Sequence, residues 1–159
     1  MNGDTIQIDV PKRELVAAFL EKVARLDRAG DIPLTDMQAR AALLPSVGAE
    51  MEGGIYAGLT IHIGMPHALV LLPGDEELPW AKAVEWAAKQ GGAQSSSLPS
   101  RIDGLVLFQN LKREFKEEYY WTSETHAGNA DYAWIQDFDD GYQGYYRKSS
   151  SAVAEPSAE

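Results

Sequence analysis

The stretch EEYYWTSETHAGNADYAWIQDFDDGYQGYY, residues Glu117–Tyr146, combines closely spaced aromatic residues with Gly, Asn and Asp, and it contains no Lys or Arg. Aromatic residues favour strands, whereas Gly, Asn and Asp favour the turns between strands. The stretch therefore predicts three strands, at Tyr119–Ser123, Asp131–Phe138 and Gly141–Lys148. The Asp-Asp-Gly sequence that begins at Asp139 predicts a hairpin turn, which makes the last two strands antiparallel neighbours.

Two helices are predicted upstream of this stretch. Residues 78–92 read LPWAKAVEWAAKQGG, and the Gly pair at the end stops the first helix. The residues that share its apolar face are Trp80, Ala83, Val84 and Ala87. Ser100 is a good N-cap for the second helix, with Asp103 three residues later. The apolar stripe expected on this second helix consists of Leu105, Phe108, Leu111 and Phe115.

Further elements are predicted in the first half of the chain. Thr5–Val10 alternates like a strand, and Pro11–Ala29 has the apolar spacing of an amphipathic helix that would serve docking or self-association. Residues 54–64 and 67–74 predict two strands joined by a tight turn at Gly-Met-Pro.

Composition shifts divide the chain into three parts. A Gly-rich break near Gly53 separates an N-terminal strand and helix extension, residues 1–52, from a main domain at 53–148. Residues 149–159 are small and polar, which predicts a disordered tail.

The composition limits the classes of function. The 159 residues are 45% hydrophobic and 24% charged, which is typical of a folded globular protein. The absence of Cys excludes disulfides, thiolate metal sites and a cysteine nucleophile. A net charge of −10 disfavours direct binding to nucleic acid. No signal peptide and no membrane span of ~20 apolar residues are predicted, so we expect a cytoplasmic or virion-associated protein without a membrane partner.

Several short motifs follow one another in the second half of the chain. Their residues are Trp80, Ala83, Leu98, Pro99, Arg101, Trp121, Thr122 and Ser123. The order of these motifs resembles the collagen-like adhesin C-terminal domain family, which occurs in bacterial and phage proteins. The resemblance runs from about Ile55 to Lys148. The resemblance implies an α+β fold similar to C-type lectins, with two helices on a small, irregular antiparallel sheet. It also implies a phage or prophage accessory protein that binds sugars, proteins or other ligands through its loops.

One departure from the family concerns the C-terminus. Family members tend to finish with an Arg-rich strand that closes the sheet, whereas this chain ends SSSAVAEPSAE. Ser151–Ala154 is the segment that could still pair, as a short edge strand.

Two groups of residues contain metal-ligating types. Asp137, Asp139 and Asp140 could ligate calcium, but their spacing does not match an EF-hand, and Asp-Asp-Gly is also an ordinary turn. His62 and His67 flank the predicted turn, so their imidazoles could approach each other. Neither group forms a recognised metal motif, so no metal and no cofactor are predicted.

A catalytic function is not predicted. Ser123, His126 and Asp131 have the residue types of a hydrolytic triad, but no nucleophile-elbow sequence surrounds the serine. Trp121, Thr122 and Ser123 could shape a pocket, but they are better explained as a core tryptophan with two hydroxyls that cap loop backbone. A hydrolase that uses Ser123 and His126 is the least favoured hypothesis.

The aromatic residues of the C-terminal strands predict a binding surface. Its members are Tyr119, Trp134, Tyr142, Tyr145 and Tyr146. Tyrosine gives contact area at a low cost in conformational entropy, as in antibody paratopes. The first hypothesis is a non-enzymatic protein that binds a protein or a carbohydrate here, and the second is an acidic inhibitor of a host defence or nucleic-acid-handling protein. The alternative is a compact sheet whose leftover tyrosines are exposed.

Overall fold

The computed structural model describes residues 44–92 and 95–158. The chain divides into two compact units, Met1–Leu44 and Pro45–Glu159. The predicted strand Thr5–Val10 and helix Pro11–Ala29, with its role in self-association, lie outside the described residues. The boundary between the two units, after Leu44, lies before the predicted boundary near Gly53. The reason is that β1 (Glu50–Met51) pairs with β2 (Gly54–His62) and so belongs to the second unit.

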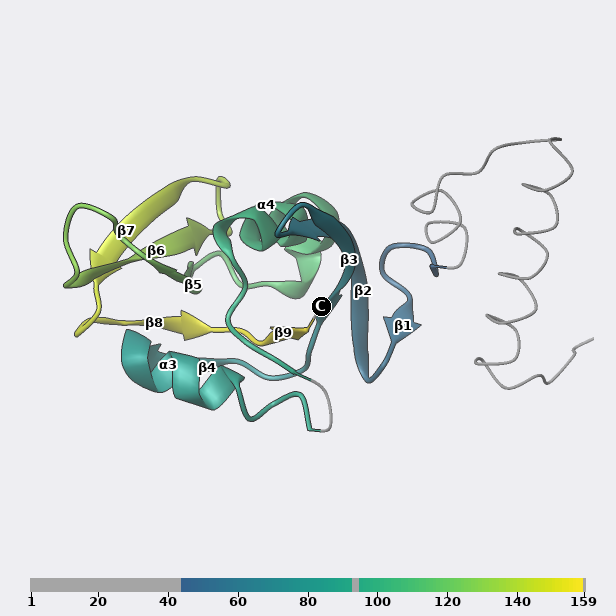
Figure 1. Cartoon of the computed structure of the whole chain (residues 1–159), viewed down its shortest axis with the longest axis horizontal. Helices are drawn as coiled ribbons and strands as arrows, with labels where there is room; N and C mark the ends of the chain where they lie inside the picture. The colour runs from purple at the N-terminus through teal and green to yellow at the C-terminus, as the bar shows by residue number, and fades with distance from the viewer. Residues whose placement is uncertain (1–43, 93–94, 159) are drawn as a thin grey trace, which may run out of the picture. The chain divides into compact units, whose positions relative to one another are not determined.

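The second unit is an α+β structure with two helices and mostly antiparallel sheets (Figure 1). One sheet has the strand order β1-β2-β3-β9, and the other has the order β4-β8-β5-β6-β7. The further elements are β3 (Met65–Leu71), β4 (Glu76–Pro79), α3 (Trp80–Ala87), α4 (Arg101–Leu111), η1 (Lys112–Glu114), β5 (Tyr119–Thr125), β6 (Tyr132–Asp137), β7 (Gln143–Arg147), β8 (Ser151–Ala154) and β9 (Ser157–Ala158).

The three strands of the aromatic stretch form as predicted. They are β5, β6 and β7, and adjacent strands of the three pair antiparallel. The Asp-Asp-Gly turn needs its glycine for two reasons. Gly141 has φ +86°, and a Cβ at this position would lie 2.7 Å from a ring carbon of Phe108. The backbone conformation of the turn and the packing of α4 therefore both require glycine at this position.

The turn between β2 and β3 lies one residue earlier than expected. His62 pairs with Met65, which makes Ile63 and Gly64 the loop residues. Both have positive φ, 49° and 75°, as the favoured two-residue hairpin turn requires. A β-branched residue in this left-handed region is strained, which is why the sequence did not indicate Ile63 as a turn residue.

The five-stranded sheet has a hydrophobic cluster on each face. On the α3 face, the buried residues are Ala83, Ala87, Leu98, Trp121, Ala133, Ile135, Ala152 and Ala154. On the α4 face, the buried residues are Ala57, Leu69, Leu71, Leu107, Leu111, Tyr120, Phe138 and Val153. Helix α4 contacts both β2 and β6, so it is covered on two sides.

The predicted stripe of α4 is only partly correct. Leu111 is buried and Phe108 and Phe115 are partly buried, as predicted, whereas Leu105 is 47% exposed. Leu107, which was not part of the predicted stripe, is buried. The buried side is centred on Gly104, where an added Cβ would lie 3.4 Å from Gln136. Helix α4 therefore packs against β6 at Gly104, and the face that it buries there does not include Leu105.

The predicted capping of α4 is confirmed. The Ser100 hydroxyl accepts from the Asp103 N–H at 3.2 Å, and the Asp103 carboxylate accepts from the Ser100 N–H at 2.8 Å. The same carboxylate accepts the hydroxyl hydrogen of Thr60 on β2. The buried Asp103 side chain therefore links the start of α4 to β2 of the other sheet through its hydrogen bonds.

We expect Asp103→Ala to destabilise the unit by about 2 kcal/mol, because it removes the cap and leaves buried donors without an acceptor. Urea denaturation followed by circular dichroism measures this loss. Asp131→Ala, at an exposed position, is the matched control. Equal stability of the two variants would show that Asp103 does not hold the sheets together.

The expected disordered tail is wrong. Strand β8 is an inner strand that pairs antiparallel with β4 and, at Tyr120 and Val153, parallel with β5. Strand β9 pairs with β3 in the other sheet. The C-terminal segment has a low hydrophobicity because its buried residues Ala152 and Ala154 are small. Both residues pack in the same cluster as the alanines of α3. A segment of small residues that packs closely therefore has a composition like that of a disordered segment.

Candidate functional site

The register of β5, β6 and β7 divides the five predicted surface residues between two faces. Tyr146 pairs with Ala133, and Tyr119 pairs with Asp137, so both belong to the face of the sheet that α3 covers. Trp134 pairs with Tyr145 on the opposite face, because successive side chains alternate along a strand. Tyr142 precedes β7 and is 63% exposed. The predicted single surface is therefore two separate surfaces.

On the first surface, Tyr119 and Tyr146 lie side by side with their ring centroids 5.1 Å apart. Tyr119 is 42% exposed and Tyr146 is 36% exposed. The neighbouring Tyr146, followed by the Asp137 carboxylate, raises the pKa of Tyr119 above its ordinary value. Its hydroxyl is therefore a neutral hydrogen-bonding group at physiological pH.

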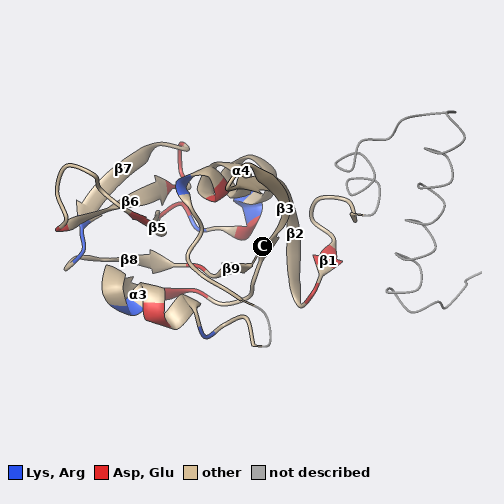
Figure 2. Cartoon of the chain, viewed as in Figure 1, with Lys and Arg blue, Asp and Glu red and all other residues tan. Residues whose placement is uncertain are grey.

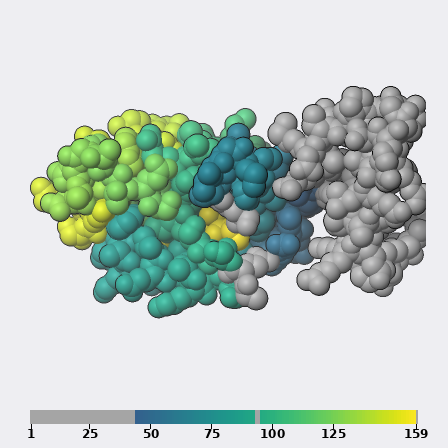
Figure 3. All heavy atoms as spheres, in the orientation of Figure 1, coloured from purple at the N-terminus to yellow at the C-terminus, as the bar shows by residue number. Residues whose placement is uncertain are grey.

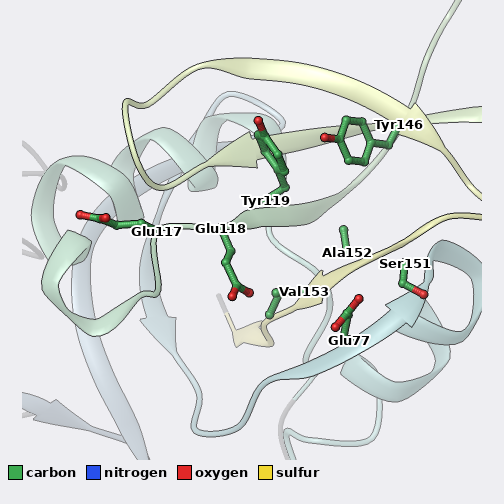
Figure 4. Close-up of a pocket in the computed structure, with 8 residues that line it drawn as sticks. All are labelled: Glu77, Glu117, Glu118, Tyr119, Tyr146, Ser151, Ala152 and Val153. Carbon is green, nitrogen blue, oxygen red and sulfur yellow. The ribbon is translucent and has the colours of Figure 1, made fainter.

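This tyrosine pair borders a pocket of about 310 Å³. The pocket is lined by Glu77, Glu117, Glu118, Tyr119, Tyr146, Ser151, Ala152 and Val153, and we call it the acidic pocket (Figure 4). It lies where β5 and β8 diverge, because these strands pair only at Tyr120 and Val153. Figure 4 shows Glu77 and Glu118 beside Val153, while Glu117 extends away from the group.

The acidic pocket has an unbalanced charge. Its lining includes three carboxylates and, among the described residues, no Lys, Arg or His. Glu77, Glu117 and Glu118 are all exposed, so water and salt can screen them. The arrangement provides two aromatic rings with their hydroxyl groups and a negative potential. These features suit a cationic group carried on an apolar stem.

The second surface is built around Trp134, and we call Arg101, Trp134, Tyr145 and His126 the arginine shelf. The Arg101 guanidinium lies 3.6 Å above the Trp134 ring. The Tyr145 ring is edge-on to Trp134 with the centroids 5.8 Å apart, and the His126 ring lies 4.5 Å from Tyr145. The Arg101 Nε donates to Gln143 at 3.2 Å, and Gln143 donates back to the Arg101 carbonyl at 2.7 Å. The side chain is therefore held in place by stacking and by hydrogen bonds.

Tyr142 belongs to neither surface. Its ring packs against Gly144, where an added Cβ would lie 2.9 Å from a ring carbon. The neighbouring acids serve the turn, since Asp137 accepts from the Asp139 N–H at 2.8 Å and Asp140 accepts from the Tyr142 N–H at 2.8 Å. Among the described residues, no group of three or more His, Asp or Glu side chains is placed to hold a metal ion.

Ser123 and His126 are not joined by a hydrogen bond in the described part of the chain. His126 instead accepts the Gly128 N–H at its Nδ1, at 3.2 Å. Ser123 is exposed, and its N–H donates to the Pro99 carbonyl at 2.9 Å. Within residues 95–158, Ser123 and His126 are therefore not arranged as a nucleophile hydrogen-bonded to its general base.

The residues of the family-like motif have structural roles. The Trp121 indole donates to the Leu78 carbonyl at 2.8 Å, and the Trp80 indole donates to the Thr122 carbonyl at 2.9 Å. Leu98 is 2% exposed. Arg101 is the exception, because its side chain takes part in the arginine shelf.

Sequence reasoning missed two features. It treated Arg101 as part of a structural motif, and only the fold brings this residue over Trp134. It also missed the exposed apolar side chains of the β2–β3 hairpin, among which Ile61 is 64% and Ile63 is 89% exposed. The hairpin strands carry no Lys, Arg, Asp or Glu (Figure 2), and the hairpin forms part of the outer surface in Figure 3. On the same hairpin, His62 and His67 approach with ring centroids 6.0 Å apart.

In the part of the chain that the structure describes, no helix has the length and apolar character needed to cross a membrane. No family model matches the chain, and no curated protein matches it either. The resemblance to the collagen-like adhesin C-terminal domain family therefore stays a prediction.

Proposed function

We propose that the chain is a non-enzymatic binding protein on a C-type-lectin-like frame, and that its acidic pocket takes a basic side chain of a protein partner. The observation that supports this most directly is the pocket lining of three glutamates and two tyrosines without a basic residue. A Lys or Arg side chain would place its stem against Tyr119 and Tyr146. Its charged end would then face Glu77 and Glu118.

The charge of the whole molecule supports a basic partner. The net charge of −10 attracts a positively charged surface over several ångströms and raises the rate of encounter. Because the pocket carboxylates are exposed, each ion pair contributes little alone, and the pocket needs its tyrosines for contact area. The predicted binding therefore depends on charge and aromatic surface together.

The same pocket supports the alternative function, an acidic inhibitor that occupies the basic site of a nucleic-acid-handling or host-defence protein. Such sites present Lys and Arg to phosphate groups. A phage or prophage accessory protein with this activity would offer carboxylates in place of phosphates. The two functions share one chemistry and differ in the identity of the partner.

The test is a titration of the full chain with a Lys- and Arg-containing peptide, followed by NMR at the amides of Tyr119 and Tyr146. We expect saturable shifts that weaken as salt rises from about 0.05 to 0.5 M. In Glu77→Gln/Glu118→Gln, we expect at least about tenfold weaker binding, because the two pocket carboxylates are neutralised. Tyr146→Ala should also weaken binding, since it removes one wall of the pocket.

Glu76→Gln/Glu114→Gln is the matched control. It changes the net charge by the same amount at two exposed positions outside the lining of the pocket. If both double variants lose the same affinity, the attraction is a property of the overall charge and the pocket is not the site. Binding of an acidic peptide with equal strength would also exclude the proposal.

A further inference from the structure

The arginine shelf lies on the face of the sheet opposite Tyr119 and Tyr146, so it does not depend on the proposed function of the acidic pocket. Its central group is the Arg101 guanidinium, which is stacked on Trp134 and bonded through Nε to Gln143. Trp134 and Arg101 are half-buried, whereas Tyr145 is 51% exposed. The shelf is therefore a fixed cation beside an accessible aromatic ring.

The terminal nitrogens of Arg101 have no protein partner within the described residues. The Glu124 carboxylate accepts from the backbone N–H of Arg101 at 2.9 Å instead of from the guanidinium. A guanidinium that is already oriented by its Nε and its stacking loses little freedom when its terminal N–H groups bind an anion. Those two groups match the two oxygens of a carboxylate.

His126 adds a second donor to the shelf. Its Nδ1 accepts the Gly128 N–H, so in the neutral ring the proton is on Nε2. The Tyr145 hydroxyl is a further hydrogen-bonding group beside it. The shelf thus presents donors next to an exposed ring face, which fits an acceptor-rich ligand with an apolar ring of its own.

The charge of the shelf favours a monoanion. Arg101 supplies a single full positive charge, while the protein carries a net charge of −10. A phosphate dianion would meet more repulsion from the whole molecule than a carboxylate would. We propose that the arginine shelf binds a carboxylate attached to a ring with an apolar face, such as an aromatic acid or a sugar acid.

In this site, Arg101 binds the carboxylate through its two terminal nitrogens, and the ring of the ligand contacts Tyr145. His126 donates to the carboxylate or to a hydroxyl of the ligand. Trp134 holds the guanidinium in position from below and gives the site a spectroscopic probe, its indole N–H.

The experiment is an NMR titration of the full chain, with the Trp134 indole resonance assigned through Trp134→Phe. The probes are benzoate and glucuronate, their neutral counterparts benzamide and glucose, and the simple anions acetate and phosphate. We expect at least one of the acids to produce a saturable shift at millimolar concentration, while the neutral compounds and acetate do not. The acid that binds more tightly identifies the source of the ligand.

Arg101→Lys keeps the positive charge but lacks the planar fork and the stacking, so we expect about tenfold weaker binding. Arg113→Lys, at an exposed position on η1, is the matched control and should leave the affinity unchanged. An unchanged Trp121 indole resonance shows that the core of each variant is intact. Equal binding of the neutral compounds, of acetate or of phosphate, or no saturable shift with either acid, would overturn the proposal.

Discussion

Trp121→Ala is expected to lower the free energy of unfolding by about 3–5 kcal/mol. Trp121 is fully buried in the cluster on the α3 face. Its removal leaves a cavity among alanines that are too small to fill it. It also leaves the Leu78 carbonyl on β4 without its donor, which lies at 2.8 Å. Urea denaturation followed by circular dichroism measures the loss.

Two further variants separate the causes of this effect. Trp121→Phe keeps most of the ring but removes the indole N–H, so we expect a loss of about 1–2 kcal/mol. Trp86→Ala, at a half-buried position at the margin of the same cluster, should cost less than Trp121→Ala. A loss below about 1 kcal/mol for Trp121→Ala would contradict its place at the centre of the core.

The stability of the unit is expected to fall as the pH rises from about 4.5 to about 8, because of Glu155. Burial, followed by the negative charge of Asp75, raises the pKa of Glu155 from 4.5 to about 8. The Lys116 ammonium opposes this shift, but it donates to Asp75. Between the two pKa values, the folded state keeps the proton and the unfolded state releases it.

The sign follows from the number of bound protons. The folded state binds more protons in this window, so the free energy of unfolding decreases with rising pH and becomes level above about 8. A pKa of about 8 in the folded state against 4.5 in the unfolded state corresponds to a total decrease of about 5 kcal/mol. Glu155→Gln cannot ionise, so it should equal the wild type near pH 4.5 and exceed its stability near pH 9.

Urea denaturation of the two proteins across this pH range measures the difference, in which the titration of all other groups cancels. Glu76→Gln, at an exposed carboxyl, is the control and should follow the wild type. Parallel curves for the wild type and Glu155→Gln would show that Glu155 ionises normally in the folded protein.

Several elements could be predicted because their signals are local. Ser100 and Asp103 are three residues apart and cap α4 with their own side chains and backbone. The Asp-Asp-Gly turn joins β6 and β7 through contacts within a few residues. Such contacts do not depend on the rest of the chain, so propensity and spacing were sufficient to find them.

The binding surfaces could be predicted only in part. The aromatic excess of the stretch predicted that some tyrosines would be exposed. Tyr119, Tyr142 and Tyr145 are all among the exposed large side chains. Their division between two faces depends on the pairing of Trp134 with Tyr145 and of Ala133 with Tyr146. Register is a property of the paired strands, because a shift by one residue would exchange the faces.

The sequence by itself determined the α+β class, the aromatic strands, the capped helix and the acidic charge, because each is expressed in neighbouring residues or in composition. Only the tertiary structure decided that Ser151–Ala154 is an inner strand and that Arg101 lies over Trp134. It also decided that two tyrosines border a pocket whose lining includes three glutamates. These contacts join residues far apart in the chain, and their stability comes from packing against partners that no local pattern identifies.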